Sequence, residues 1–377
     1  MLQYLEKQSG VKIVIDYFSC TFPLKVQEDE LELIVVEDLV KFIGNTIGFD
    51  NTEILKEEYA TGRYKYQYTI GQTITIRLGG PLLLSGYKSC QIELRGQGCR
   101  EVESRSSLTW VEFFDLFLLR LDGSPTRIDI AIDDYDGDKA TLPKIKEVLD
   151  KRNYVTSFRK KYYKLMGCDE DGWSIQFGSH KSTMMFVIYD KLKEQLSKGN
   201  EVDQEFWTRY EMRFMKEKAY NVVMNLTEVG MEGFNNYCYG LLYSMLDLKS
   251  DNGYSEHNMG QAETIPWWSD FLGNVSKSEI TKYKVKRVAL DSYKEWFYPL
   301  LSTYLLLMFV LNGEDVDAIF TSMLEESMDN LVKLDKKKVK NINVFLDEVG
   351  QKKIGMDKVQ IFLDKVKKYT AMKKLPF

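Results

Sequence analysis

The sequence predicts an α+β fold, in which an antiparallel β-sheet is backed by helices and followed by a helical carboxy-terminal region. Strand-like segments occur in adjacent pairs with helical segments between them, and this order favours an antiparallel sheet. After about residue 265 the strand signal fades and apolar, helix-like segments take over. We therefore expect two regions, residues 1–265 and residues 266–377.

Alternating or β-branched segments mark the expected strands. They are residues 12–22, 64–78, 89–95, 127–133, 173–177, 184–189 and 207–215. Gly71 indicates a bulge or turn within the second segment, and the glycines of GQGCR, residues 96–100, indicate a turn after the third. The segments 173–177 and 184–189 should pair around the turn GSHKS.

Helical spacing is found in four segments between the strands: residues 30–42, 109–121, 142–150 and 190–196. Thr109 and Glu112 have the spacing of a capping box, and Pro143 is tolerated in a first helical turn. The two halves of this region repeat the order of elements but not the sequence. The order therefore suggests an internal duplication that the residues themselves do not show.

The composition narrows the class of protein. The 377 residues are 44% apolar and 28% charged, as in a globular protein with one large domain or two. Only two histidines are present, which argues against His-rich zinc sites and most triad hydrolases. Five scattered cysteines without a CxxC motif, and an amino terminus unlike a signal peptide, lead us to expect a reduced, cytoplasmic protein.

Two carboxy-terminal segments have unusual charge. Residues 296–312 carry no charge, but they contain Pro299 and are too few to cross a bilayer readily as a helix. We therefore expect a buried helix and no membrane association. Residues 331–377 contain thirteen lysines against five acidic residues, although the whole chain has a net charge of −5. This basic end favours contact with a polyanion, and a solvated helix surface is the alternative.

The segment RIDIAID, residues 127–133, carries the first set of candidate site residues. Side chains alternate across a strand, so the isoleucines share one face, while Arg127, Asp129 and Asp133 share the other with Ala131. Charges between isoleucines are costly unless they are paired or bind a metal. Carboxylate oxygens suit Mg²⁺ or Mn²⁺. An ordinary amphipathic strand with one face in water is the alternative.

The segment WTRYEMR repeats this pattern, because Arg209, Glu211 and Arg213 fall on one face. If this strand lies beside the first, Glu211 and Asp129 converge on one cation, and the arginines hold phosphates by forked hydrogen bonds. A cross-strand ladder of salt bridges is the alternative.

The segment between these strands adds a turn and a tyrosine. His180 and Lys181 lie in the turn GSHKS, whose backbone N–H groups, hydroxyls and charge suit a phosphate, although the P-loop pattern is missing. Tyr189 ends the following strand and precedes Lys191. A tyrosine at such a boundary is usually a half-buried packing residue.

Four blocks, in this order, resemble the replication initiation factor family, which includes rolling-circle plasmid initiators and relaxases of conjugative elements. The blocks are VIDYFSCTF, ELRGQGCREVE, TRIDIAIDD, and GSHKS with FVIYDKLKEQ and WTRYEMR, and together they span residues 14–214. Further segments, WWSDFL, VSKSEITKYK and SYKEWF, resemble the carboxy-terminal part of longer, relaxase-like members. Each block is short, but the ordered set is specific. The resemblance implies a fold like that of the HUH endonucleases.

The resemblance also implies roles for individual residues. Tyr189 would attack the scissile phosphodiester, giving a 5′-phosphotyrosine. The acidic positions fall on Asp129, Glu211 and, from the first strand, Asp16, with a weaker match at Asp133; these carboxylates would hold Mg²⁺ or Mn²⁺. A cation such as Lys191 or Arg209 would favour the phenolate of the tyrosine, whose ordinary pKa is about 10.

The expected function is therefore nicking and rejoining of one DNA strand by residues 1–265, for rolling-circle replication or conjugative transfer. Origin DNA, a host helicase and a second copy of the chain are the expected partners. The basic carboxy-terminal region would hold duplex DNA through lysines that include Lys336, Lys337 and Lys338.

Two alternatives and two departures stay open at this point. A DNA-binding regulator could keep the fold without catalysis, and a metal-dependent nuclease would use water instead of tyrosine. His180 and Val187 stand where family members often have arginine. Fewer fixed cations would reduce the stabilisation of transition-state charge, which leaves room for a weakly active or inactive member.

Overall fold

The structure, a computed structural model, describes residues 5–8, 10–25, 32–83, 87–138, 140–160, 162–168, 172–251, 253–273 and 275–282. They belong to one compact unit, formed by Met1–Leu83 and Tyr87–Val285. The apolar segment 296–312 and the basic segment 331–377, with Lys336, Lys337 and Lys338, lie outside the described residues. Within the described ranges, no helix has both the length and the apolar character needed to cross a membrane.

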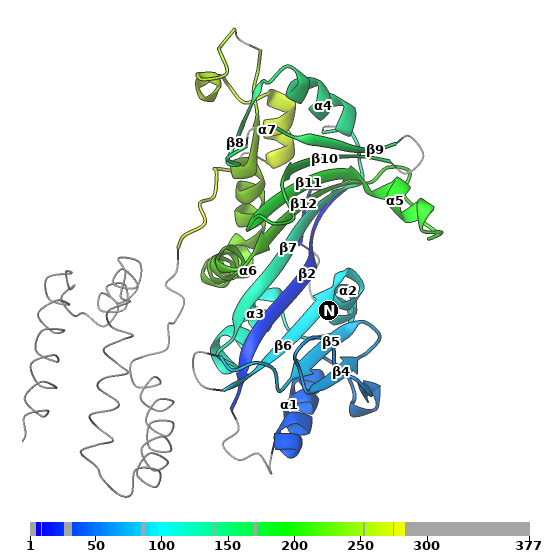
Figure 1. Ribbon diagram of the computed structural model, residues 1–377. Helices are drawn as coiled ribbons and strands as arrows, with labels where there is room; N and C mark the ends of the chain where they lie inside the picture. Colours follow the sequence, from blue (N-terminus) through cyan, green and yellow to red (C-terminus); the bar gives the residue numbers. More distant parts are fainter. Residues whose placement is uncertain are drawn as a thin grey trace, which may run out of the picture. The chain divides into compact units, whose positions relative to one another are not determined.

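A single antiparallel sheet of eleven strands organises this unit (Figure 1). Its strands are β1 (Leu5–Gln8), β2 (Val11–Leu24), β3 (Ile54–Lys56), β4 (Tyr66–Ile70), β5 (Ile74–Leu78), β6 (Lys88–Arg95), β7 (Ser124–Asp134), β9 (Lys164–Cys168), β10 (Gly172–Gly178), β11 (Met184–Asp190) and β12 (Thr208–Met215). They follow the order β3-β4-β5-β6-β2-β7-β12-β11-β10-β9, and β1 pairs with β2. A separate pair joins β8 (Tyr154–Thr156) to β13 (Leu246–Leu248). The predicted α+β class, with an antiparallel sheet, is confirmed.

The helices complete the element list: α1 (Glu32–Thr46), α2 (Gly96–Arg105), α3 (Trp110–Asp115), α4 (Leu142–Asp150), α5 (Lys191–Ser197), α6 (Glu217–Met245) and α7 (Pro266–Leu272). Short turns of other helix types are η2 (Asn51–Glu53), η3 (Leu116–Arg120) and η4 (Met259–Gln261).

The connectivity of the sheet is duplicated about its two central strands. From β2 the chain passes through α1 and then through β3, β4 and β5 to β6, which returns to pair with β2. From β7 it passes through α4 and then through β9, β10 and β11 to β12, which returns to pair with β7. The strands β2 and β7 join the two halves. This repeated connectivity agrees with the duplication that the order of elements suggested.

Apolar side chains on one face of the sheet hold α3 and α6 against it. Ile128, Ile130 and Ile132 on β7 are fully buried, as strand alternation requires. Phe18 on β2 packs edge-on against Phe113 of α3, with 5.4 Å between ring centroids. Figure 1 shows α3 and α6 on the same side of the central strands. Burial of each large apolar side chain contributes about 1.5–3 kcal/mol.

Most local expectations agree with the structure. Gly71 has a φ of +61° in the turn between β4 and β5. Thr109 and Glu112 form the capping box at the start of α3. The turn predicted at residues 96–100 is wrong, because this segment begins α2. A Cβ atom on Gly96 would lie 3.2 Å from Asp16 Oδ1, and one on Gly98 would lie 3.2 Å from Thr73. These glycines allow close packing within a helix, not a turn.

Helix α7 lies beyond the expected boundary at residue 265 but packs inside the first unit. The ring of Phe271 is 4.8 Å from that of Tyr210 on β12, and Trp268 is fully buried. The indole N–H of Trp268 donates a hydrogen bond to the carbonyl oxygen of Leu246 at 3.2 Å. Residues 266–272 therefore belong to the core around the sheet.

Candidate active site

Polar residues from three neighbouring strands meet on the face of the sheet opposite α3 and α6. In the register, Arg209 of β12 pairs with Tyr189 of β11 on one side and with Asp133 of β7 on the other. Residues paired across antiparallel strands share a face, so these three side chains form one row. Two residues along β12, Glu211 lies between Val187 and Ala131.

A β-bulge brings a further carboxylate to this face. The register between β2 and β7 shifts between Ile15 and Tyr17, so Asp16 is the extra residue. Asp16 and Tyr17 are consecutive, and both are only partly buried in a strand whose flanking residues are buried. The bulge therefore directs Asp16 towards Arg209, and Asp16 Oδ1 lies 2.7 Å from Arg209 Nη1.

Arg209 is the centre of a buried charge cluster. Its side chain is 5% exposed, and Nε and Nη2 donate hydrogen bonds to the two Asp133 oxygens at 2.7 and 2.8 Å. Burial alone would raise the pKa of Asp16, but Arg209 and Lys191 outweigh it and hold that pKa below its ordinary value. Because both of its edges are engaged with carboxylates, Arg209 is a positioning residue in this arrangement and does not face a phosphate.

Tyr189 reaches the predicted neighbourhood of Glu211. Its hydroxyl donates a hydrogen bond to Glu211 Oε2 at 3.1 Å, and Lys191 Nζ lies 3.5 Å from the same hydroxyl. Burial and the charge of Glu211 raise the pKa of Tyr189 above its ordinary value. Of the two cations expected to favour the phenolate, Arg209 lowers the pKa of Tyr189, but burial and Glu211 outweigh it. Glu211 is placed to accept the phenolic proton.

The three expected metal ligands are bound to arginine or tyrosine instead of converging as a set. Arg127 donates to both oxygens of Asp129, at 2.9 and 2.5 Å. Arg213 Nε donates to Glu211 Oε1 at 2.6 Å. Burial and the neighbouring Glu211 raise the pKa of Asp129 to about 6. Among the described residues no group of three or more His, Cys, Asp or Glu is placed to hold a metal ion. The predicted three-carboxylate metal site does not fit this arrangement.

The turn with His180 and Lys181 lies at the far end of the β10–β11 hairpin from Tyr189. Tyr189 pairs with Ser174, whereas Met185, next to the turn, pairs with Gly178. Four residues along a strand span about 13 Å. His180 and Lys181 are exposed there, so the structure does not bring them to the tyrosine. Val187, two residues before Tyr189, is 8% exposed and lies opposite Glu211.

Two aromatic residues next to the site were not predicted. The rings of Tyr135 and Trp207 lie 5.3 Å apart, and the Arg209 guanidinium lies 5.7 Å from the Trp207 ring. The carbonyl oxygen of Trp207 accepts hydrogen bonds from the first N–H groups of α5, which follows Tyr189. Trp207 lies two residues before Arg209, so the alternation of side chains along a strand places both on the same face. The sequence pattern could therefore have identified it.

The same polar face continues into the amino-terminal half. Arg77 Nη1 donates to Glu93 Oε2, and Arg95 Nε donates to Glu93 Oε1, both at 2.8 Å. Burial would raise the pKa of Glu93, but these arginines and the hydroxyl of Tyr17 lower it to about 2. The guanidinium of Arg127 stacks 4.0 Å from the Tyr17 ring and links this cluster to Asp129.

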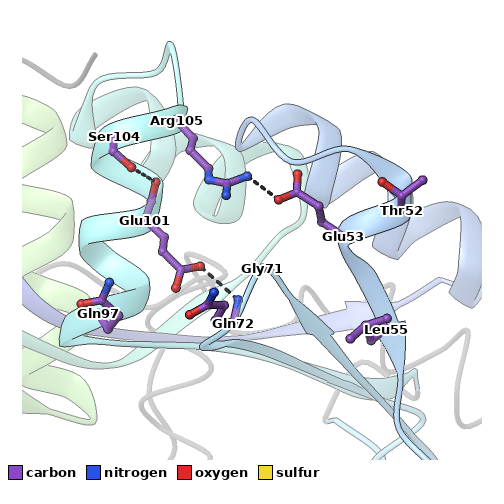
Figure 2. Close-up of a pocket in the computed structure, with 9 residues that line it drawn as sticks. All are labelled: Thr52, Glu53, Leu55, Gly71, Gln72, Gln97, Glu101, Ser104 and Arg105. Carbon is purple, nitrogen blue, oxygen red and sulfur yellow. Dashed lines mark hydrogen bonds and ion pairs between the residues drawn. The ribbon is translucent and has the colours of Figure 1, made fainter.

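Two cavities in the described part of the chain lie away from this face. A cavity of about 430 Å³ lies between α2 and the β4–β5 turn, and its walls include Glu53, Gln97 and Glu101 (Figure 2). Another, of about 800 Å³, lies beside α4 and β8. Tyr189, Arg209, Glu211 and Asp129 line neither of them. These residues belong to a sheet surface and not to either cavity.

The buried Arg209 cluster yields a stability prediction. Arg209→Met should lower the free energy of unfolding by about 3–5 kcal/mol, because two carboxylates lose their partner in a buried setting. Urea unfolding at pH 7 measures this. The control is Arg152→Met, which removes an exposed ion pair with Glu256 and should leave the free energy of unfolding almost unchanged. Equal losses in the two variants would contradict the central role of Arg209.

Glu93 yields a pH prediction. Because its folded pKa is lowered, its contribution to stability is present above the ordinary Glu pKa of about 4.3 and is lost as the pH falls towards 2. Glu93→Gln should therefore be less stable than the native chain at pH 7, by about 1–3 kcal/mol, and the gap should close at acid pH. Urea unfolding across pH 2.5–7, with exposed Glu58→Gln as control, tests this; a gap independent of pH would refute it.

The chain is similar in sequence and in fold to known proteins. The family model described as replication initiation factor matches residues 123–324, and that of the rolling circle replication initiation protein N-terminal domain matches residues 12–117. A Bacillus subtilis (strain 168) protein named "Putative DNA relaxase NicK" is 34% identical over 204 residues, which are 49% of this chain and 54% of that protein. The chain thus matches about half the length of this curated relative.

A solved structure of a rolling circle replication initiator protein from Geobacillus stearothermophilus has a similar fold. The TM-score is 0.57 at 20% identity, over 73% of this chain and all of that one. The first family model covers more than half of the 377 residues, including every strand of the candidate site except β2. The chain belongs to the replication initiation factor family.

Proposed function

We propose that this chain nicks and rejoins one strand of DNA through Tyr189, to initiate rolling-circle replication or conjugative transfer. The hydrogen bond from the partly exposed Tyr189 hydroxyl group to buried Glu211 carries the proposal, since it pairs a nucleophile with a proton acceptor on the polar face of the sheet. The names of the relatives, a relaxase and a rolling-circle initiator, support the same chemistry.

The reaction is a transfer of the phosphoryl group. The Tyr189 oxygen attacks the scissile phosphorus while its proton passes to Glu211, and the bond from phosphorus to the 3′ oxygen breaks. The 3′ oxygen takes up a proton and becomes a free hydroxyl, and the 5′ end stays attached as a phosphotyrosine. Attack by the hydroxyl on that ester reverses the steps and rejoins the strand.

Lys191 and Arg209 support Tyr189 in different ways. Lys191 places positive charge near the tyrosine oxygen, where a phosphate would approach. Arg209 binds Asp133 and Asp16, and it lies opposite Tyr189 on the neighbouring strand, so it helps to fix the position of Tyr189. Trp207 and Tyr135, which pack on each other beside Arg209, are partly exposed aromatic side chains next to which an unpaired base would stack.

We propose in addition that the reaction requires Mg²⁺ or Mn²⁺. The support for this requirement is a charge balance: four carboxylates, Asp16, Asp129, Asp133 and Glu211, face three guanidinium groups, Arg127, Arg209 and Arg213, while the charge of Lys191 is paired with Glu194. A further cation would offset the repulsion between this cluster and an incoming phosphate.

Other parts of the proposal rest on the sequence. Origin DNA would be the substrate, held in part by Arg127, Arg213 and the lysines of residues 331–377. A helicase and a second copy of the chain are proposed partners. The main alternative is a DNA-binding regulator that keeps the fold without catalysis. A nuclease that uses water would leave cut DNA with no attached protein.

Tyr189→Phe should abolish a covalent adduct. The native chain, incubated with single-stranded oligonucleotides that tile the DNA around its own gene, should give a species that survives denaturing electrophoresis. Glu211→Gln should slow its formation by about 10²–10⁴-fold, because the proton acceptor is weakened. Tyr162→Phe, at an exposed tyrosine, is the matched control. An adduct that persists in Tyr189→Phe would refute the assignment, and no adduct in the native chain would favour the regulator.

Removal of divalent cations should also suppress the adduct. With EDTA the yield should fall close to background, and added Mn²⁺ or Mg²⁺ should restore it, since the carboxylates near Tyr189 outnumber the guanidinium groups. Matched NaCl additions control for ionic strength. An undiminished yield in EDTA would show that the protein's own cations suffice.

A further inference from the structure

The amino-terminal half of the duplicated sheet contains a second cluster of charged residues, at the position that corresponds to the Tyr189 site. Glu93 of β6 and Glu211 of β12 each lie on the strand that returns to a central strand. Their local sequences are Glu-Leu-Arg and Glu-Met-Arg, at residues 93–95 and 211–213. When Glu93 is matched to Glu211 along the two strands, Arg95 corresponds to Arg213.

The contacts of the two glutamates correspond atom by atom. Arg95 Nε donates to Glu93 Oε1 at 2.8 Å, and Arg213 Nε donates to Glu211 Oε1 at 2.6 Å. The second oxygen of each glutamate accepts from the neighbouring outer strand. Arg77 of β5 donates to Glu93 Oε2 at 2.8 Å, and Tyr189 of β11 donates to Glu211 Oε2 at 3.1 Å.

Arg77 therefore occupies the register position of the nucleophile. It pairs with Gln91, two residues before Glu93, as Tyr189 pairs with Arg209, two residues before Glu211. A guanidinium cannot attack phosphorus but binds a phosphate well. On the central strand, Tyr17 pairs with Arg95 as Asp129 pairs with Arg213, so this half replaces one carboxylate by a neutral phenol.

The charge of the second cluster suits an anion. One carboxylate, Glu93, faces two guanidinium groups, Arg77 and Arg95, so one positive charge is left over. The side chain of Arg95 is 72% exposed, and an exposed ion pair is weak enough to exchange for a phosphate contact. Arg127, 30% exposed, stacks on Tyr17 and pairs with Asp129, and it thereby joins this cluster to the part of the face that carries Tyr189.

We propose that the cluster of Arg77, Glu93, Arg95 and Tyr17 is a non-catalytic counterpart of the Tyr189 site, and that it binds a phosphate of the same single-stranded DNA. This second proposal rests on the proposed function only in assuming that DNA binds to this face of the sheet. The strand would be held by Arg95 in one half of the sheet and presented to Tyr189 in the other. The ligand is a phosphodiester of unpaired DNA, bound without cleavage.

The test measures binding without cleavage. Arg95→Ala is combined with Tyr189→Phe, so that no covalent product forms, and its affinity for a fluorescent single-stranded oligonucleotide is measured by anisotropy at several NaCl concentrations. The control is Arg63→Ala in the same background, since Arg63 is an exposed arginine of the same half without an ion pair in the described structure. Both variants lose one positive charge.

Arg95→Ala should weaken binding about tenfold at low salt and reduce the slope of log affinity against log salt by about 0.7, as expected for one lost contact to single-stranded DNA. Arg63→Ala should keep the parent slope. An unchanged affinity and slope for Arg95→Ala, or the same change in both variants, would overturn the proposal, and so would a parent that binds no oligonucleotide. If Arg95→Ala weakens binding although no variant with Tyr189 ever forms an adduct, this proposal stands and the nicking function falls.

Discussion

The contact between Arg209 and two carboxylates is the constraint on which the rest of the candidate site depends. Asp133 and Asp16 come from the two central strands, so this single guanidinium joins β2, β7 and β12 on the polar face. A buried arginine without these partners would be costly, and so would the carboxylates without it. The cluster thereby fixes the position of β12, and with it Glu211 and the partner strand that carries Tyr189.

The sequence predicted which residues share a face, because alternation along a strand is a local property. Arg127, Asp129 and Asp133 on β7, and Arg209 and Glu211 on β12, lie together as that alternation requires. The pairing partners were not predictable, since they depend on register and on the bulge at Asp16. The salt-bridge ladder, an alternative kept for β12, describes the observed contacts better than a metal cluster does.

The fold was predicted where the periodicity was strong and missed where it was not. The long helix α6 was not predicted. It contains Gly230 with non-helical backbone angles and many buried residues, so its sequence lacks the polar stripe of an amphipathic helix. The glycines that begin α2 indicated a turn, but in the structure they allow close packing against Asp16 and Thr73. The order of elements indicates the duplication, but the matching positions of Glu93 and Glu211 depend on strand register, which the sequence alone does not show.

The identity of the residue that carries DNA after the reaction tests the account most directly. The covalent complex formed on a single-stranded oligonucleotide would be digested with a protease and a nuclease, and the modified peptide sequenced by mass spectrometry. The account predicts a nucleotide on the peptide Phe-Val-Ile-Tyr-Asp, at Tyr189. A nucleotide on any other tyrosine, Tyr17 included, would contradict it.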